Sequence, residues 1–417
     1  MIWLLGGYMW LFIHRPFEVW PWLGGLHVER MYMIATILYW GIAVDKQWIR
    51  NRLNLAFACF WLAMLAAWIA SPYAARGTHT VEDYFKIVVF YVLVVSTVRT
   101  ERDLKLLVMM FLGAMGLYMA HSFREYLCGR YVYRMGTARM VGVDATMGDP
   151  NTFAATVVYS LPMVFPVWNC IKNSRFRWVL AGYVGLATTC VLLTGSRMGF
   201  VGLCALALIV VLLSKHRVTI ILLLAIAAPL AWISLPEDRQ NRYLTLIDPS
   251  YGPASAQASA EGRWQGWRDG VKLWKENPVF GVGPGVFGTA TGSKMQSHHL
   301  YGQVLGELGT LGAVAFGMIV LGFFANYFDL RRICRQEPDL RDSFPTRLIQ
   351  SVTVTVVLLL LMGLAGHSLY RYTWLWFGAF QAIALHCLLR QGEELACAEP
   401  SYVVDVPGSA SGQCETV

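Results

Sequence analysis

The chain has 417 residues, of which 56% are hydrophobic and only 14% are charged. Soluble domains usually carry about 25% charged residues, so this composition excludes an ordinary soluble protein, and the 13% aromatic content excludes a disordered one. The net charge of +8 would favour nucleic-acid binding in a soluble chain, but in a membrane protein its meaning depends on the side on which each charge lies.

The chain begins with an apolar stretch, Met1–Leu5, that lacks the basic region and cleavage site of a signal peptide, so we expect it to remain as a short membrane segment. A spanning helix needs about 20 mostly apolar residues. The candidate spans are 1–14, 30–45, 53–70, 83–98, 104–121, 151–169, 178–194, 198–214, 218–235, 301–326, 348–366 and 372–389. The predicted fold is an all-α polytopic membrane protein with about 12 transmembrane helices, or eleven if the short first segment is incomplete.

Half of the 34 Lys and Arg residues lie in alternate connections between these segments and after the last one. Because short loops rich in Lys and Arg stay in the cytoplasm, an even number of spans places both termini there. Residues 1–235 then hold nine spans, 236–300 form a large extracytoplasmic loop, and 301–390 hold three spans. Residues 391–417 contain acids but no Lys or Arg and are predicted to be a disordered tail. The nine cysteines show no metal or disulfide spacing and are interpreted as packing residues.

The outer segment 122–150 opposes the usual charge bias, because it carries four arginines and no lysine. These are Arg124, Arg130, Arg134 and Arg139. One interpretation is a solvated or headgroup-facing surface. The other is recognition of an anionic ligand, because the planar guanidinium matches phosphate oxygens.

The loop 236–300 contains a small-residue stretch, 250–259, that is typical of a flexible tip or lid. Trp264, Trp267, Val271 and Trp274 follow at helical spacing and predict an amphipathic helix over 261–274, with tryptophans typical of the membrane interface. Arg263, at the beginning of this helix, is a better candidate for function. The glycine cluster 281–288 favours tight turns over an anion-binding nest, and no strand precedes it as dinucleotide binding would require.

Two adjacent histidines, His298 and His299, lie at the membrane–water boundary before the next span. A neutral imidazole at this position could take a proton from a hydroxyl group. The sequence has no metal-ligand set, so we expect arginines, and no metal or cofactor, to neutralise phosphate charge. Glu307 lies inside the span, where an ionisable group is a candidate for function. Close helix packing around neighbouring glycines, with a hydrogen bond to Gln303 or His299, is an equal alternative, and we expect Glu307 to support the histidine loop.

Five motifs occur in a fixed order around this loop. They are Asp149-Pro150-Asn151, Thr194-Gly195-Ser196-Arg197, Arg263 with the tryptophan helix, Asn277-Pro278-Val279-Phe280-Gly281, and His298 followed by Leu305-Gly306-Glu307-Leu308-Gly309. Together they resemble the O-antigen ligase and polymerase superfamily of bacterial membrane glycosyltransferases, and most of all the lipopolysaccharide O-antigen ligases. The resemblance implies transfer of a glycan from undecaprenyl diphosphate to a sugar of lipid A–core at the periplasmic face of the inner membrane.

The resemblance also implies roles for individual residues. His298 would be the general base, and Arg197 and Arg263 would bind the diphosphate. Further substrate-binding candidates are Arg139, Arg268 and His299, and supporting candidates are Asp149, Asn151, Glu307 and Arg371.

Other functions stay open at this point. A polymerase and a protein O-oligosaccharyltransferase use the same donor and differ in the acceptor. A transporter or flippase of lipid-linked glycans is less favoured, because the centres of the spans carry almost no charge and no internal repeat is found.

Overall fold

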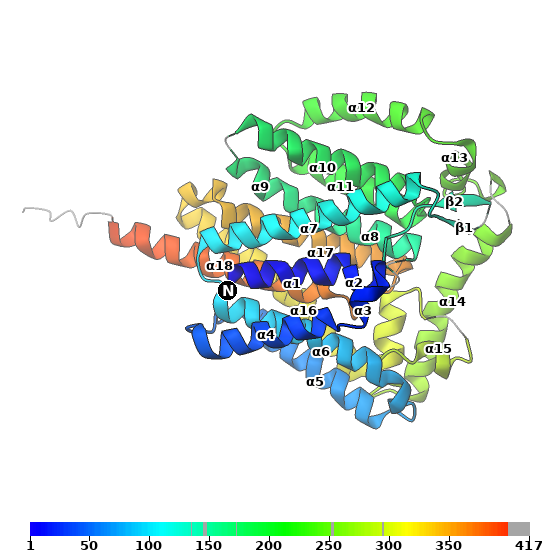
Figure 1. Ribbon diagram of the computed structural model, residues 1–417, viewed down its shortest axis with the longest axis horizontal. Helices are drawn as coiled ribbons and strands as arrows, with labels where there is room; N and C mark the ends of the chain where they lie inside the picture. Colours follow the sequence, from blue (N-terminus) through cyan, green and yellow to red (C-terminus); the bar gives the residue numbers. More distant parts are fainter. Residues whose placement is uncertain (135, 145–147, 172, 252–253, 294–295, 399–417) are drawn as a thin grey trace, which may run out of the picture.

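The computed structural model describes residues 1–398 except 135, 145–147, 172, 252–253 and 294–295. The described chain is a bundle of long helices with one short β-hairpin, which confirms the predicted all-α polytopic fold class (Figure 1). The N-terminus and the C-terminal end of the last helix lie at one end of the bundle, whereas the hairpin and the helices of the large loop lie at the other. The candidate site is built at this second end.

The first part of the chain forms helices that pack around the later ones. They are α1 (Ile2–His14), α2 (Pro16–Val19), α3 (Pro21–Gly24), α4 (Val28–Ala43), α5 (Arg52–Ala70), α6 (Ala74–Thr97) and α7 (Glu101–Leu127). The Asn51 side chain caps α5 by accepting from the Leu53 amide, and Thr100 caps α7 in the same way. α1 packs mainly on α7, and α5 packs on α16 (Leu300–Gln336).

A β-hairpin and four membrane segments follow. The elements are β1 (Val132–Arg134), β2 (Thr137–Arg139), α8 (Pro150–Ser160), η1 (Leu161–Met163), α9 (Val164–Cys170), α10 (Ser174–Leu193), α11 (Arg197–Leu213) and α12 (Arg217–Ile233). The strands are antiparallel, with Val132 opposite Arg139. β1 is exposed while Arg139 at the end of β2 is buried, so the hairpin directs this arginine into the protein.

The large loop contains α13 (Glu237–Leu244), η2 (Pro249–Tyr251), α14 (Ala254–Glu276) and α15 (Phe287–Ala290). α14 is longer than the predicted helix and begins inside the stretch expected to be a flexible tip, so residues 254–259 are helical. It crosses α16 very closely: a Cβ atom added to Gly270 would lie 2.3 Å from the carbonyl oxygen of Gly302. Only glycine permits this approach, which fixes α14 against the start of α16.

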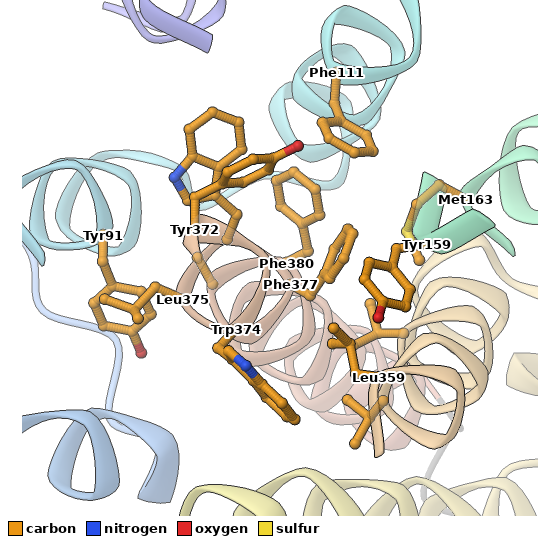
Figure 2. Close-up of a cluster of buried hydrophobic side chains, with 14 of the residues drawn as sticks. Tyr91, Phe111, Tyr159, Met163, Leu359, Tyr372, Trp374, Leu375, Phe377 and Phe380 are labelled. Atoms are coloured by element: carbon orange, nitrogen blue, oxygen red, sulfur yellow. The ribbon is translucent and has the colours of Figure 1, made fainter. Parts of the chain in front are cut away.

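The last part of the chain holds α16, η3 (Pro338–Asp342), α17 (Phe344–Met362), η4 (Gly363–Ala365) and α18 (Tyr372–Ala398). α16 is kinked at Gly309, where residues of the Asn277–Gly283 segment pack into the break. α18 is the central helix of the bundle. In its apolar stretch 89% of the residues are buried, against 28% in that of α10. Figure 2 shows Trp374, Phe377 and Phe380 of this helix packed among side chains of α6, α7, α8 and α17.

Each of the twelve predicted membrane segments is helical, but the number twelve is not confirmed. Among the described residues, seven helices are long and apolar enough to cross a membrane, or eight if α12 and α13, bent by 120°, are counted as one broken span. α1, α4, α11 and α12 have fewer than 18 residues, and α6 carries charged residues in its first half. The chain is therefore a multi-pass membrane protein with at least these seven candidate spans.

The predicted disordered tail, 391–417, differs from the structure in its first part. α18 continues through Ala398, so residues 391–398 are helical. The remaining tail residues, 399–417, lie outside the described part of the chain.

Candidate functional site

A cavity of about 380 Å³ lies at the end of the bundle that carries the hairpin and the large loop. Its wall combines segments far apart in the sequence: the hairpin, α8, α11, α13, α14, the loop before α16, and the turn between α17 and α18. The charged and imidazole side chains that line it are Arg134, Arg139, Asp149, Arg197, Arg242, Arg263, His298, His367 and Arg371. Among the described lining residues, Asp149 is the one acid facing six arginines.

The two adjacent histidines have different surroundings. His298 lines the cavity. His299 is the N-cap of α16, where its Nδ1 accepts a hydrogen bond of 3.2 Å from the Gly302 amide, and its ring packs 5.3 Å from the ring of Trp267. The structure therefore brings His298, and not His299, to the cavity.

The imidazole of His298 is held in its neutral form. Burial lowers its pKa, the nearby Arg263 and Arg134 lower it further, and Asp149 opposes them. A pKa below the usual value of about 6.5 leaves the ring neutral at pH 7. A neutral imidazole that faces a cavity can accept a proton.

Arg197 is positioned by the turn between α10 and α11. Gly195 has a positive φ of 58° that favours glycine, and the Ser196 side chain caps α11 by accepting from the Gly199 amide. Arg197 is thereby the first residue of α11, and its Nη1 donates to Oγ1 of Thr245 over 3.3 Å. Arg242 of α13 reaches the same turn and donates from Nε to the Gly195 carbonyl oxygen over 2.6 Å.

Arg139 joins the hairpin to this turn and to α8. Its Nε donates to the Thr194 carbonyl oxygen over 2.7 Å, and its Nη2 donates to Oδ1 of Asn151 over 3.0 Å. Asp149 caps α8 by accepting from the amides of Asn151 and Thr152. The Asp149–Asn151 motif therefore sets the start of α8 and holds one cavity arginine.

The arginines of the cavity lie close enough to repel one another. Burial, together with the smaller effect of the charges of Arg197 and Arg242, lowers the pKa of Arg263 to about 10. Burial and the charge of Arg242 likewise lower the pKa of Arg139 to about 9. Such an accumulation of like charge is destabilising by itself and is typical of a site that binds an anion. We call Arg134, Arg139, Arg197, Arg242 and Arg263 the arginine cluster.

The turn between α17 and α18 forms another part of the wall. His367, Ser368, Arg371 and Thr373 all line the cavity. Burial lowers the pKa of His367 to about 4, with smaller effects from Arg371 and His298. The rings of His298 and His367 are 5.3 Å apart between centroids.

Glu307 lies outside the cavity wall and is completely buried in α16. Its carboxylate accepts hydrogen bonds from the amides of Gly285 and Phe287, over 2.9 and 3.2 Å, and from the hydroxyl of Tyr370 over 2.7 Å. The hydrogen bond from Gln303 that the sequence predicts is also present, at 3.4 Å. The glycine cluster forms tight turns as expected, and two of its amides are directed at this carboxylate.

Most of the predicted site residues meet at the cavity. His298, Arg197, Arg263, Arg139, Asp149, Asn151 and Arg371 all line it. Arg268 does not, because it lies exposed on α14 outside the cavity wall.

Arg134, named from the sequence only among the arginines of segment 122–150, lines the cavity. So do residues that the sequence did not predict for the site: Arg242 and, in the turn between α17 and α18, His367, Ser368, Tyr372 and Thr373. The concentration of arginine in the loop 236–300 is the signal that could have found Arg242. Nothing in the local sequence distinguishes the turn between α17 and α18 from an ordinary connection. Among the residues that the structure describes, no three His, Cys, Asp or Glu side chains are grouped as a metal site would need.

Comparison with known proteins adds one match. A search of the curated proteins finds none that matches the chain. A family model described as O-Antigen ligase matches residues 182–317, which include the Arg197 turn, Arg242, Arg263 and His298. This match, over residues 182–317, confirms the resemblance to the O-antigen ligase and polymerase superfamily that the motifs indicate, and it supports a function of that type.

Proposed function

We propose that the protein transfers a glycan from undecaprenyl diphosphate to a sugar hydroxyl group of lipid A–core. The reaction takes place at the periplasmic face of the bacterial inner membrane. His298 acts as general base, and Arg197 and Arg263, with Arg139, bind the diphosphate.

One observation carries this proposal: a neutral imidazole shares a cavity with the five arginines of the arginine cluster, which come from four separate segments. A diphosphate needs several guanidinium groups to neutralise its charge and to hold its oxygens. A sugar hydroxyl needs a base that is unprotonated at neutral pH. Both requirements are met in one cavity at the end of a bundle of membrane helices, where a lipid-linked donor would present its head group.

The proposed reaction is a single inverting displacement. His298 takes the proton of the acceptor hydroxyl as its oxygen attacks the anomeric carbon of the donor. A new glycosidic bond forms, the bond between that carbon and the diphosphate oxygen breaks, and undecaprenyl diphosphate leaves with the electron pair. The arginine cluster stabilises the negative charge that develops on the leaving oxygen.

In this proposal the arginines carry out the charge neutralisation that a divalent cation performs in many other transferases. Transfer should therefore continue in EDTA. Activity that disappears in EDTA and returns with Mg²⁺ or Mn²⁺ would contradict the metal-independent mechanism.

The experiment that tests the function uses purified protein with an undecaprenyl-diphosphate-linked glycan and one of two acceptors. The first is lipid A–core and the second is another lipid-linked repeat. We expect product with lipid A–core, because the basic outer segment 122–150 suits a phosphorylated acceptor. Product only with the second acceptor would show a polymerase, and movement of intact donor across the bilayer without transfer would show a flippase.

A further inference from the structure

The turn between α17 and α18 contains buried polar atoms without partners. Oγ of Ser368, Oγ1 of Thr373, the Tyr372 hydroxyl and Nδ1 of His367 are all enclosed, and none of them has a hydrogen-bond partner among the described residues. Ser368 and Thr373 are only 6% and 3% exposed. All four residues line the cavity. Because buried polar groups are nearly always hydrogen-bonded in native proteins, this concentration in one segment indicates a polar ligand.

The backbone of this segment is held by hydrogen bonds, so its hydroxyl groups have fixed positions in the cavity wall. The indole Nε1 of Trp374 donates to the Ser368 carbonyl oxygen over 3.0 Å, and the Arg371 amide donates to the same oxygen over 3.1 Å. The Tyr370 hydroxyl donates a hydrogen bond to the carboxylate of the buried Glu307. The turn is therefore anchored to α16 and to α18 on either side of the cavity-lining hydroxyls.

The chemistry of this segment differs from that of the arginine cluster. The cluster offers guanidinium groups, which match phosphate oxygens. The turn offers two aliphatic hydroxyls and an imidazole, with one cation, Arg371. Hydroxyl groups that can both donate and accept are suited to the hydroxyl groups of a sugar.

His298 has neighbours in both parts of the wall. Asp149 acts on the pKa of both histidines, whereas Arg263 and Arg134 of the cluster act on that of His298 and Arg371 acts on that of His367. The ring of His367 is adjacent to that of His298. In an inverting displacement the attacking hydroxyl approaches from the side opposite to the leaving diphosphate. The sugar that carries this hydroxyl therefore lies beyond His298, toward the turn.

We propose that the turn His367–Thr373 binds the acceptor sugar, with the side chains of His367, Ser368 and Thr373 hydrogen bonding its hydroxyl groups. This inference rests on the proposed function, because it takes the diphosphate to lie at the arginine cluster. It assigns the two substrates to two separate parts of one cavity.

The test is a double variant, Ser368→Ala with Thr373→Val, which removes two hydroxyls with little change of shape. The matched control is Thr355→Val, which removes a buried hydroxyl of α17 that bonds within the protein. We expect the KM for lipid A–core to rise at least about tenfold in the double variant. The KM for the donor and the binding of bare undecaprenyl diphosphate should stay as in the wild type, and the control should match the wild type in all three.

Three results would overturn the inference. A rise in the KM for the donor alone would assign the turn to the donor sugar. No change in either KM would make the hydroxyls irrelevant to binding, and a lowered Tm with a proportional loss of kcat would give them a structural role. Because the two hydroxyls have no partners in the described protein, their removal should leave the Tm unchanged or higher.

The proposed function can fail separately. Wild-type protein that binds no undecaprenyl diphosphate would refute the donor assignment and, with it, the arrangement of substrates. If the wild-type protein glycosylates the second lipid-linked repeat in place of lipid A–core, the same KM comparison is made with that acceptor. The ligase assignment would then be wrong, but the KM comparison would still show whether the turn binds the acceptor sugar.

Discussion

The imidazole rings of His298 and His367 lie next to each other at the cavity, 5.3 Å apart between centroids, although they belong to opposite ends of the α16–α17 region. Burial lowers the pKa of both rings. The pair therefore carries no charge at neutral pH, and the positive charge of the cavity belongs to the arginines. This separation of neutral imidazoles from cationic side chains is the basis of the predictions below.

His298→Ala should reduce transfer by at least about 100-fold, because general base catalysis commonly contributes that much or more. Binding of undecaprenyl diphosphate should be retained, since the arginine cluster is unchanged. The measurement is single-turnover transfer together with lipid binding.

His299→Ala is the matched control, because it alters the neighbouring residue and removes the cap of α16 and the ring contact with Trp267, outside the cavity. It should lower the free energy of unfolding by about 1 kcal/mol and keep most of the activity. If His299→Ala lost transfer while His298→Ala remained active, His299 and not His298 would be the base.

Arg263→Lys should lower kcat/KM about 10- to 100-fold, since a charge-assisted hydrogen bond contributes about 1.5–3 kcal/mol and Lys cannot form the two-pronged contact. Arg197→Lys should behave in the same way. Arg268→Lys, on the exposed face of α14, is the control and should be fully active. Wild-type rates in either cluster variant would remove that arginine from the diphosphate site.

The protein should stay active to a lower pH than expected for a base with the ordinary pKa of histidine. In the proposed mechanism the transfer reaction needs neutral His298, whose pKa lies below its ordinary value because of burial. The rate, followed as kcat/KM, should thus stay high as the pH falls through 6.5 and decline only below it.

Asp149→Asn should shift this decline to still lower pH, because the Asp149 charge is the one that raises the pKa of His298. Asn retains the ability to cap α8, so the fold should be preserved. A decline that moves to higher pH in this variant would show that another group titrates.

Glu307→Gln should lower the free energy of unfolding by about 1–3 kcal/mol, because an amide group cannot accept at both oxygen positions and would face a donor with its NH₂. Tyr370→Phe removes a single donor and should be milder, at about 1 kcal/mol. Thermal unfolding of the purified proteins measures both. Equal stability of Glu307→Gln and the wild type would contradict the four-donor arrangement.

The sequence predicts much of this architecture, and the limits have physical causes. Apolar segments predict where helices form, because in a bilayer a helix satisfies the backbone hydrogen bonds of such a segment internally. Length decides which of them can span, and α1 and α4, with 13 and 16 residues, fall short of the roughly 20 residues that a spanning helix needs.

The candidate site was predictable where a local motif fixes its geometry. Ser196 and Asp149 cap helices, and each motif brings its neighbouring residue to the cavity. Arg242 and His367 reach the cavity only through packing of helices distant in the sequence. A local sequence pattern cannot predict contacts between helices that are distant in the sequence.

The arginine cluster has a consequence for the end of the reaction cycle. If the guanidinium groups stabilise the departing diphosphate as we propose, they also bind it after the bond is broken, so the spent carrier should be a competitive inhibitor of its loaded form. Escape of that carrier into the bilayer, and not bond formation, would then set the pace of repeated turnover. A membrane in which undecaprenyl diphosphate is removed quickly would allow this protein to work faster.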